Sequence, residues 1–174
     1  TDMAGQAARA PRRAPISAVM IVRDAAATLR RTLDSLGWAA EVIVYDNGSR
    51  DDTRAIAAGY PNTRVVEGQF IGFGPTRNAA TMLATNDWIF AIDSDEAVTG
   101  ELRDSLAAVD LSELRVVFAV HRRNFLLGRA VQHSGWGNDW LVRLYNRTQA
   151  SYDDALVQES VRPGPGIRVQ RLCG

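Results

Sequence analysis

Short apolar runs alternate with amphipathic segments along most of the chain. Several of these runs contain few or no polar positions, as strands buried on both faces require. The runs that we expect to form strands are 16–22, 42–45, 64–67, 88–92, 116–120 and the half-exposed 141–145. Strands that alternate with helices in this way predict a doubly wound α/β domain.

The segments between the strands have the apolar spacing of helices that pack on one face. Leu29, Leu33 and Leu36 share such a face, Asp24 is a suitable N-cap, and Gly37 supplies a stop. We expect the other helices to start at residues 51–53, to span 76–83 with Pro75 at the first position, and to include residues 102–109.

The alternation of strand and helix stops after His121. Residues 124–140 contain three glycines and two tryptophans, which predicts a hairpin or loop region over the ligand crevice of the sheet. The two Pro-Gly pairs at 163–166 are expected to end compact structure. We therefore expect a flexible lead-in at 1–15, one domain at 16–161 and a tail at 162–174.

The charged residues do not favour a nucleic-acid partner. The 20 basic and 20 acidic side chains cancel, so no net field attracts a polyanion. The sequence contains no Lys, which excludes a lysine Schiff base and a P-loop lysine.

Cysteine content and hydropathy bear on the compartment. The single Cys173 can form neither an internal disulfide nor a thiolate metal site, which fits a reducing, cytoplasmic compartment. No apolar run reaches the ~20 residues that span a bilayer, so we expect a protein that is soluble or peripherally attached to a membrane.

Three carboxylates follow the apolar run 88–92, in the sequence Asp93-Ser94-Asp95-Glu96. The carboxyl ends of the strands form the ligand crevice of an open α/β sheet, so these acids are expected to face a bound ligand. Asp93 and Asp95 alternate along an extended chain and point the same way, and such a pair suits a hard divalent cation shared with substrate phosphates. The alternative is a polar turn that caps the following helix.

Other strand ends carry polar or glycine-rich turns. Asp24 follows the first strand, Asp46 ends the second, and residues 72–78 open a helix. Arg77 and Asn78 lie in the first turn of that predicted helix, where backbone amides and the helix dipole favour an anion; alternatively, Arg77 is a surface arginine. Such an edge suits a nucleotide with a diphosphate and a metal, while the first strand-helix turn lacks the G-x-G-x-x-G of a dinucleotide-binding enzyme.

In order and spacing, four segments resemble the signature segments of family 2 glycosyltransferases of the GT-A fold. They are residues 16–24, residues 41–49 with 51–53, residues 72–78, and Asp93-Ser94-Asp95. The distal half resembles the branch of this family that adds glucose to heptose in the inner core of bacterial lipooligosaccharide. The segments that carry this second resemblance are Arg122 to Gly128, His133 to Trp136, and Asp139 to Arg147.

The sequence departs from that branch at one position. Gln158 stands where the branch has a histidine, and an amide is a weaker ligand for Mn²⁺ than imidazole. The chain also ends before the helices with which such enzymes dock on the membrane, so we expect it to be truncated relative to the family.

The resemblance implies the fold and the donor site. GT-A enzymes have a Rossmann-like, mostly parallel central sheet flanked by helices, with a small antiparallel strand pair over the site. By resemblance, the contacts to the nucleotide-sugar are Asp24, Asp46, Arg77, Asn78 and Asp93. Asp95 is expected to hold Mn²⁺ or Mg²⁺, with Asp93 near the ribose or bound to the metal through water. Asp46 has the alternative role of a helix cap.

Inverting transfer also needs a carboxylate that takes the proton from the acceptor hydroxyl. Glu159 and Asp139 are the candidates, and Glu159 is preferred because its position along the chain leaves room for the strand pair. Either acid could instead be an ion-pair partner of Arg143 or Arg147. Trp136 and Arg143 are the candidate contacts to the acceptor sugar. Trp136 and Trp140 either form a stacking platform for this sugar or cover the core.

The resemblance implies transfer of a hexose, with glucose favoured, from a UDP-sugar to a glycolipid or oligosaccharide such as inner-core heptose. This reaction would take place in the cytoplasm, with peripheral contact at the inner face of the inner membrane. The alternative function is a nucleotide-sugar-binding domain with little or no transfer activity. A sugar-phosphate nucleotidyltransferase needs a catalytic Lys, which the sequence lacks.

Overall fold

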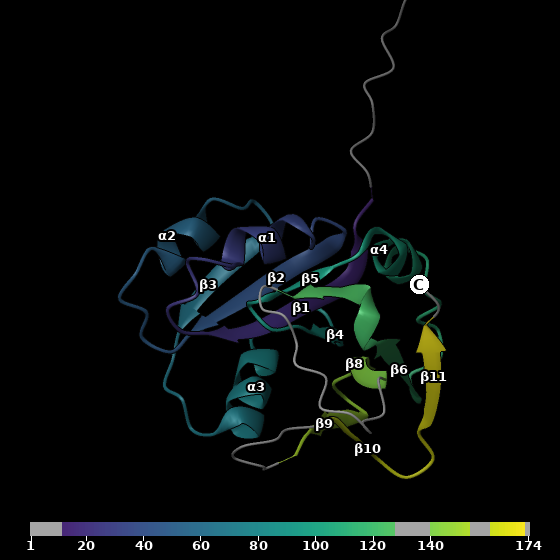
Figure 1. Cartoon of the computed structure of the whole chain (residues 1–174). Coiled ribbons are helices and arrows are strands. Elements are labelled where there is room, and N and C mark those ends of the chain that lie inside the picture. The colour runs from purple at the N-terminus through teal and green to yellow at the C-terminus, as the bar shows by residue number, and fades with distance from the viewer. Residues whose placement is uncertain (1–11, 128–139, 154–160, 173–174) are drawn as a thin grey trace, which may run out of the picture.

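A seven-stranded sheet forms the centre of the domain (Figure 1). The structure is a computed structural model that describes residues 12–127, 140–153 and 161–172. Along the sheet the strand order is β11-β6-β8-β4-β1-β2-β3. Its strands are β1 (Ala14–Val22), β2 (Ala39–Asp46), β3 (Thr63–Glu67), β4 (Trp88–Ala91), β6 (Val116–His121), β8 (Trp140–Asn146) and β11 (Arg168–Leu172). Only β8 runs antiparallel to its described neighbours, so the sheet is mostly parallel, as predicted.

Helices cover both faces of the sheet. α1 (Leu29–Asp34), α2 (Thr53–Ala58) and α4 (Gly100–Ala107) lie on one face, and α3 (Phe73–Met82) lies on the other (Figure 1). Successive side chains of a strand point to opposite faces, so β1 contributes to two cores. Ile16 and Met20 pack in the core that includes α1, α2 and α4, whereas Val19 packs with Ala80 of α3. No helix in the described residues combines the length and the hydropathy that a membrane crossing requires.

Two smaller antiparallel strand pairs accompany the main sheet. β5 (Glu96–Val98) pairs with β7 (Phe125–Leu127), and β9 (Ala150–Tyr152) pairs with β10 (Val161–Pro163). A short 3₁₀ turn, η1 (Arg122–Asn124), precedes β7. The resemblance implied a small antiparallel strand pair, whereas the apolar pattern did not locate these strands, because three residues are too few to show an alternation of apolar and polar positions.

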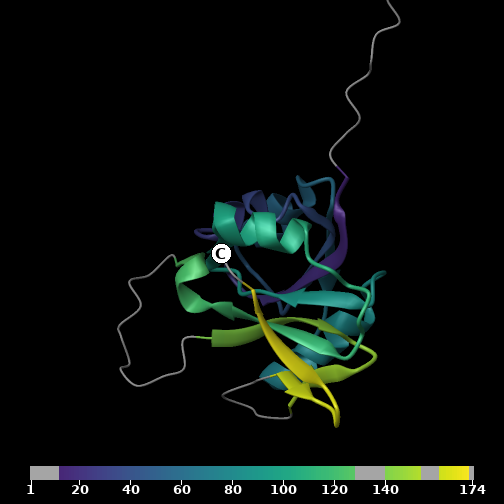
Figure 2. The same cartoon turned by 90° about the vertical axis from the view of Figure 1, so that its right-hand side faces the viewer.

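The expectation that residues 163–166 end compact structure is wrong. This segment is a turn in which the Ile167 N–H donates to the Gly164 carbonyl (3.3 Å) and Gly166 adopts a φ of 75°. The chain then returns as β11 and pairs in parallel with β6 at the edge of the sheet (Figure 2). Of the β11 side chains, Leu172 is buried and the rest are exposed, which explains why no apolar run marked this strand.

Two helices also begin at positions that differ from those expected. α1 begins at Leu29 rather than directly after Asp24, which has a φ of 50° and so is not helical. α3 begins at Phe73, which makes Pro75 its third residue and puts Arg77 and Asn78 in its second turn. The prediction that Arg77 and Asn78 lie in the first turn of this helix is therefore wrong.

Candidate functional site

A cleft of about 640 Å³ lies at the carboxyl ends of β1 and β4. Its described lining comes from the end of β1 with the loop that follows, from Phe73 and Arg77 of α3, and from Asp93, Ser94 and Asp95. Two arginines and three aspartates are among the lining residues. Such a lining suits an anionic ligand that arrives with a cation.

Asp93 lies between two arginines at this cleft. Arg77 of α3 pairs with Asp93 Oδ1, and Arg143 Nη2 of β8 lies 4.0 Å from Asp93 Oδ2. The side chain of Asp93 remains 42% exposed, so a ligand can reach it. Burial opposes ionisation, but the Arg77 and Arg143 guanidiniums outweigh it and hold the pKa of Asp93 below 3.8. Asp93 is therefore an anion at neutral pH.

Glu96 belongs to the same charge cluster, but it is buried and does not line the cleft, so the expectation that it faces a bound ligand is wrong. Arg143 donates from Nη1 to Glu96 Oε1 (2.7 Å) and from Nη2 to Oε2 (3.1 Å). The Asp93 N–H also donates to Glu96 Oε1 (2.9 Å). Burial raises the pKa of Glu96, Arg143 opposes this shift, and the charge of Asp93 adds to it, so that the net pKa lies above 4.5.

A turn, rather than an extended chain, brings these acids together. The Glu96 N–H donates to the Asp93 carbonyl (3.1 Å), which closes a four-residue turn. The expectation that Asp93 and Asp95 alternate along an extended strand is therefore wrong, although both residues line the cleft. The signal for this turn was present in the sequence, because Asp and Ser favour turns.

Asp95 is the carboxylate most available to a metal. Its side chain is exposed, and it forms no hydrogen bond or ion pair within the part of the chain that the structure describes. The described ranges contain no group of three or more His, Cys, Asp or Glu side chains arranged to hold a metal. A cation at Asp95 would therefore draw further oxygens from a ligand and from water, which is how Mg²⁺ binds with substrate phosphates.

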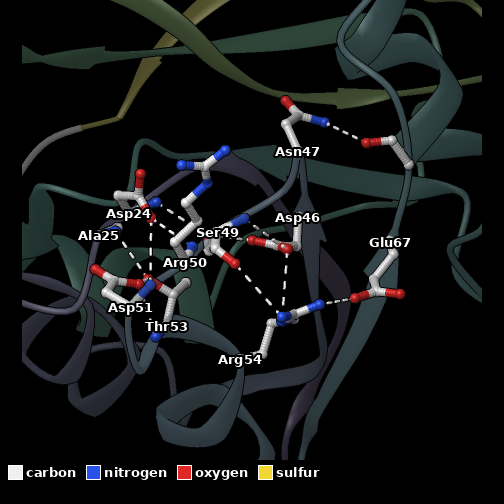
Figure 3. Close-up of polar contacts among 11 residues, drawn as sticks. Asp24, Ala25, Asp46, Asn47, Ser49, Arg50, Asp51, Thr53, Arg54 and Glu67 are labelled. Atoms are coloured by element: carbon white, nitrogen blue, oxygen red, sulfur yellow. Dashed lines mark hydrogen bonds and ion pairs between the residues drawn. The ribbon is translucent and has the colours of Figure 1, made fainter.

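Asp24 joins the loops that follow β1 and β2 (Figure 3). Its Oδ1 accepts hydrogen bonds from the N–H groups of Arg50 (2.7 Å) and Asp51 (3.4 Å), and its own N–H donates to Ser49 Oγ (2.9 Å). Asp51 in turn accepts from the Ala26 N–H (3.0 Å). Asp24 lines the cleft, so it holds the loop that forms one wall of the cleft. Contact between Asp24 and the nucleoside stays a prediction.

Asp46 has no exposed surface and does not line the cleft. Its carboxylate accepts from the Ser49 N–H (3.2 Å) and from the Ser49 hydroxyl, and Arg54 Nε lies 3.8 Å away (Figure 3). The N-cap of α2 is Asp52, so Asp46 caps no helix. A nucleoside contact by Asp46 stays a prediction, and it would require the Ser49 loop to move.

Asn78 connects α3 to β9. Its Nδ2 donates to the Tyr152 carbonyl (3.1 Å), and the Tyr152 N–H donates to Asn78 Oδ1 (3.0 Å). The Arg77 guanidinium lies over the Tyr152 ring, 5.4 Å from its centroid. Arg77 thus reaches the cleft as predicted, whereas a nucleotide contact by Asn78 stays a prediction because its amide is engaged by backbone.

A smaller cavity of about 150 Å³ lies beside the cleft. Arg77 and Asp93 line both spaces, and Arg143, Tyr152 and Val161 add to the lining of the smaller one. The β9–β10 pair therefore borders the candidate site.

Several of the predicted site residues lie outside the described residues. These are the candidate bases Glu159 and Asp139, the candidate acceptor contact Trp136, and Gln158 with its departure from the family pattern. Their roles stay predictions.

The arginines that could have paired with the candidate bases have other partners. Arg143 pairs with Glu96, and Arg147 Nε lies 3.0 Å from Asp87 Oδ1. The guanidinium of Arg143 also lies over the Phe125 ring, 5.0 Å from its centroid. The side chain of Arg143 is 13% exposed and lies 4.0 Å from Asp93 of the cleft lining, and a contact between Arg143 and the acceptor stays a prediction.

Residues 17–169 match the family model for glycosyl transferase family 2. The chain belongs to this family. The glycosyltransferase family thus accounts for the mostly parallel sheet, for the acidic turn after β4 and for the position of the cleft at the strand ends.

Curated relatives of this family 2 glycosyltransferase come from several bacteria. An uncharacterized glycosyltransferase of Rickettsia felis is 34% identical over 118 residues, which cover 67% of this chain and 38% of the relative. The lipopolysaccharide core biosynthesis glycosyltransferase LpsC of Rhizobium meliloti is 29% identical over 156 residues, covering 86% of this chain and 57% of LpsC. The chain therefore spans less than two thirds of either relative.

Solved structures share the GT-A fold with this glycosyltransferase. S. aureus TarS, residues 1–349, superposes with a TM-score of 0.56 and 24% identity over 71% of this chain and 38% of that chain. The mannosyltransferase PcManGT from Pyrobaculum calidifontis superposes with a TM-score of 0.50 and 22% identity over 64% of this chain and 36% of that chain.

Proposed function

We propose that this family 2 glycosyltransferase moves a hexose, with glucose favoured, from a UDP-sugar to a bacterial cell-surface glycan, with inversion and with Mn²⁺ or Mg²⁺ bound. The observation that carries the proposal is the cleft at the ends of β1 and β4, where the exposed Asp95 carboxylate lies beside the paired Arg77 and Asp93. A nucleoside diphosphate with its cation needs this combination of a free carboxylate and fixed cationic groups.

The donor class is supported by the solved relatives. TarS has been crystallised with UDP-GlcNAc and with UDP, and PcManGT with GDP-Man and Mn²⁺. These structures share the fold at low identity, so the uridine base is a proposal for this chain and a guanosine nucleotide belongs in its test. The acceptor class is supported by LpsC, whose name places it in lipopolysaccharide core biosynthesis. Inner-core heptose is the acceptor that the distal half of the sequence favours.

The described residues fit a divalent cation at Asp95, because this carboxylate is exposed and its oxygens are unpaired within the described ranges. When bound, such a cation would neutralise the charge that develops on the departing nucleoside diphosphate. Asp93, already paired with Arg77 and near Arg143, is better suited to a ribose hydroxyl or to a metal-bound water than to direct ligation.

The chain's own residues supply the rest of the reaction. Arg77 holds Asp93 at the cleft through an ion pair, and Asp24 holds the loop after β2 through the Arg50 N–H. A carboxylate, Glu159 in preference to Asp139, would take the proton of the acceptor hydroxyl as its oxygen attacks the sugar carbon and the nucleoside diphosphate leaves.

A second candidate function is nucleotide-sugar binding with little or no transfer. It is favoured by Gln158 in the place of the family's histidine, because an amide is a weaker metal ligand than imidazole. Donor binding without transfer to any acceptor would establish this second function.

Thermal unfolding with a panel of nucleotides tests the donor site. We expect UDP to raise the melting temperature only with Mn²⁺ or Mg²⁺, because Asp95 would hold the cation and the cation would neutralise the charge of the diphosphate. With the ligand at about a hundredfold over its Kd, the gain is ~2.7 kcal/mol in the free energy of unfolding. Asp95→Asn should abolish the metal-dependent shift. A shift of equal size without metal, or a preference for ADP over UDP and GDP, would contradict the proposal.

A glucose-transfer assay to a heptose-containing acceptor tests the base. Glu159→Gln keeps the shape of the side chain and removes proton transfer, a contribution of ~10²–10⁴ in rate. Asp139→Asn is the matched variant, and it should retain activity if Glu159 is the base. Full activity in both variants would exclude both carboxylates, and Asp153 and Asp154 would be tested next.

A further inference from the structure

Glu96 is a buried acid at the site that the proposed reaction does not use directly. Its side chain is 8% exposed, and its two oxygens accept from both ends of the Arg143 guanidinium, at 2.7 and 3.1 Å. An acid buried to this degree loses its hydration, so it is retained as an ion only where its partners replace water.

The contacts of Arg143 show what Glu96 does for the site. Arg143 Nη1 donates both to Glu96 Oε1 and to the carbonyl of Ala91 at the end of β4 (3.1 Å). Arg143 Nη2 donates to Glu96 Oε2 at 3.1 Å, whereas Asp93 Oδ2 is 4.0 Å from the same nitrogen. Arg143 therefore lies within reach of two carboxylates and is hydrogen-bonded to the one that does not line the cleft.

Glu96 also holds the backbone of Asp93. The Asp93 N–H donates to Glu96 Oε1 (2.9 Å), and the Glu96 N–H donates back to the Asp93 carbonyl (3.1 Å). Side chain and backbone together fix the turn that presents Asp93 to the cleft. Asp93 Oδ1 is engaged by Arg77, so Oδ2 is the oxygen for which a second guanidinium and a ligand would compete.

We infer that Glu96 is a positioning residue of the donor site, which engages Arg143 in a two-point pair and thereby keeps Asp93 Oδ2 available to the nucleotide-sugar. Without the Glu96 charge, the nearest anion to Arg143 is Asp93, and an arginine on each oxygen would block that carboxylate. This inference rests on the proposed function, because it assigns Glu96 to the binding of the same donor.

A double-mutant cycle tests the inference with UDP and Mn²⁺ as the probe, by calorimetric titration of the full chain. We expect Glu96→Gln to weaken UDP binding about tenfold, the lower end of what loss of an outer partner of a binding group costs. We expect Arg143→Met to have a smaller effect, and Glu96→Gln/Arg143→Met to bind within about threefold of Arg143→Met alone, because the competing arginine is then absent. The double variant also leaves no uncompensated buried charge, so it folds even where Glu96→Gln does not.

Asp87→Asn is the matched control. Asp87 directly precedes β4 and pairs with Arg147, which directly follows β8, at the end of these two strands that is opposite to the cleft (Nε–Oδ1 3.0 Å). It should bind UDP as the parent does. Parent-like binding by Glu96→Gln, or additive losses in the double variant, would overturn the inference while leaving the proposed function intact. Failure of the parent itself to bind UDP with Mn²⁺ would overturn both.

Discussion

Arg77 reaches Asp93 from the second turn of α3, and Arg143 reaches it from β8. Sequence reasoning predicted that Arg77 and Asp93 both face the ligand, because each lies near a strand end or a helix start. The pairing of Arg77 with Asp93 was not predicted, since no local pattern in the sequence relates a residue of α3 to the turn between β4 and β5. The Glu96–Arg143 pair was missed for the same reason: the two residues are distant in sequence and are brought together only by the antiparallel insertion of β8 beside β4.

Removal of the Arg77 side chain should therefore weaken nucleotide binding. Arg77→Ala leaves Asp93 without its closest counter-charge and removes a cationic group from the cleft, so we expect about a tenfold higher Kd for UDP with Mn²⁺. The melting temperature should fall only modestly, because Asp93 is partly exposed and Arg143 remains near. Arg103→Ala on the exposed face of α4 is the control and should change neither quantity. Global unfolding of Arg77→Ala would show that Arg77 is a structural residue.

At the scale of elements, the loops after β1 and β2 behave as one unit. Asp51 accepts from the Thr53 hydroxyl, from the Thr53 N–H (3.0 Å) and from the Ala26 N–H (3.0 Å), and the Ala25 N–H donates to Thr53 Oγ1 (2.8 Å). The expectation that a helix starts at residues 51–53 is correct for α2. No local pattern in the sequence could show that the same side chains also hold the neighbouring loop, which lines the cleft.

The hydrogen bond between Asp51 and Thr53 predicts that the stability of the fold depends on pH. The hydrogen bond from the Thr53 side chain lowers the pKa of Asp51; desolvation raises it, and hydrogen bonds from the backbone lower it further, so that the net pKa lies below 3.8. A carboxyl whose folded-state pKa is depressed contributes stability above its unfolded pKa and loses it as the pH falls through the folded pKa. Asp51→Asn should therefore melt below the parent at neutral pH, and the two curves should converge well below 3.8. A constant difference at every pH would mean that the carboxylate charge has no role.

The elements that sequence reasoning predicted and missed differ in burial. β1, β2, β4 and β6 are buried on both faces and carry continuous apolar runs, so their existence followed from the pattern. β11 is exposed along most of its length and β5 has three residues, so neither shows a period. The predicted starts of α1 and α3 differ from the observed ones because Asp24 and Pro75 can each take more than one structural role. Asp24 bridges two loops through backbone N–H groups, and Pro75 fits inside the first turn of α3 as well as at its start.

At the scale of the whole molecule, one rule predicted which acidic strand ends meet at the cleft. Because the parallel strands end at the same edge, Asp24, Asp93 and Asp95 converge on one cleft although they come from different connections. Asp46 shows the limit of the rule, since it also lies at a strand end and yet is fully buried, with its carboxylate hydrogen-bonded to Ser49. The sequence thus predicts which polar residues lie at the carboxyl edge of the sheet. It does not predict which of their side chains point into the cleft.

Arg77 and Asp93 line both the large cleft and the small cavity beside it, so the two spaces share a wall made of one ion pair. A ligand in the cleft that binds Asp93 would weaken the Arg77–Asp93 ion pair. The positive charge of Arg77 at the small cavity would then be less neutralised. Linkage then requires that a group bound in the cavity alter affinity in the cleft by the same factor as the reverse. If donor and acceptor occupied these two spaces, they would not bind independently. In steady-state kinetics with both substrates varied, the apparent KM of each substrate would then change with the concentration of the other.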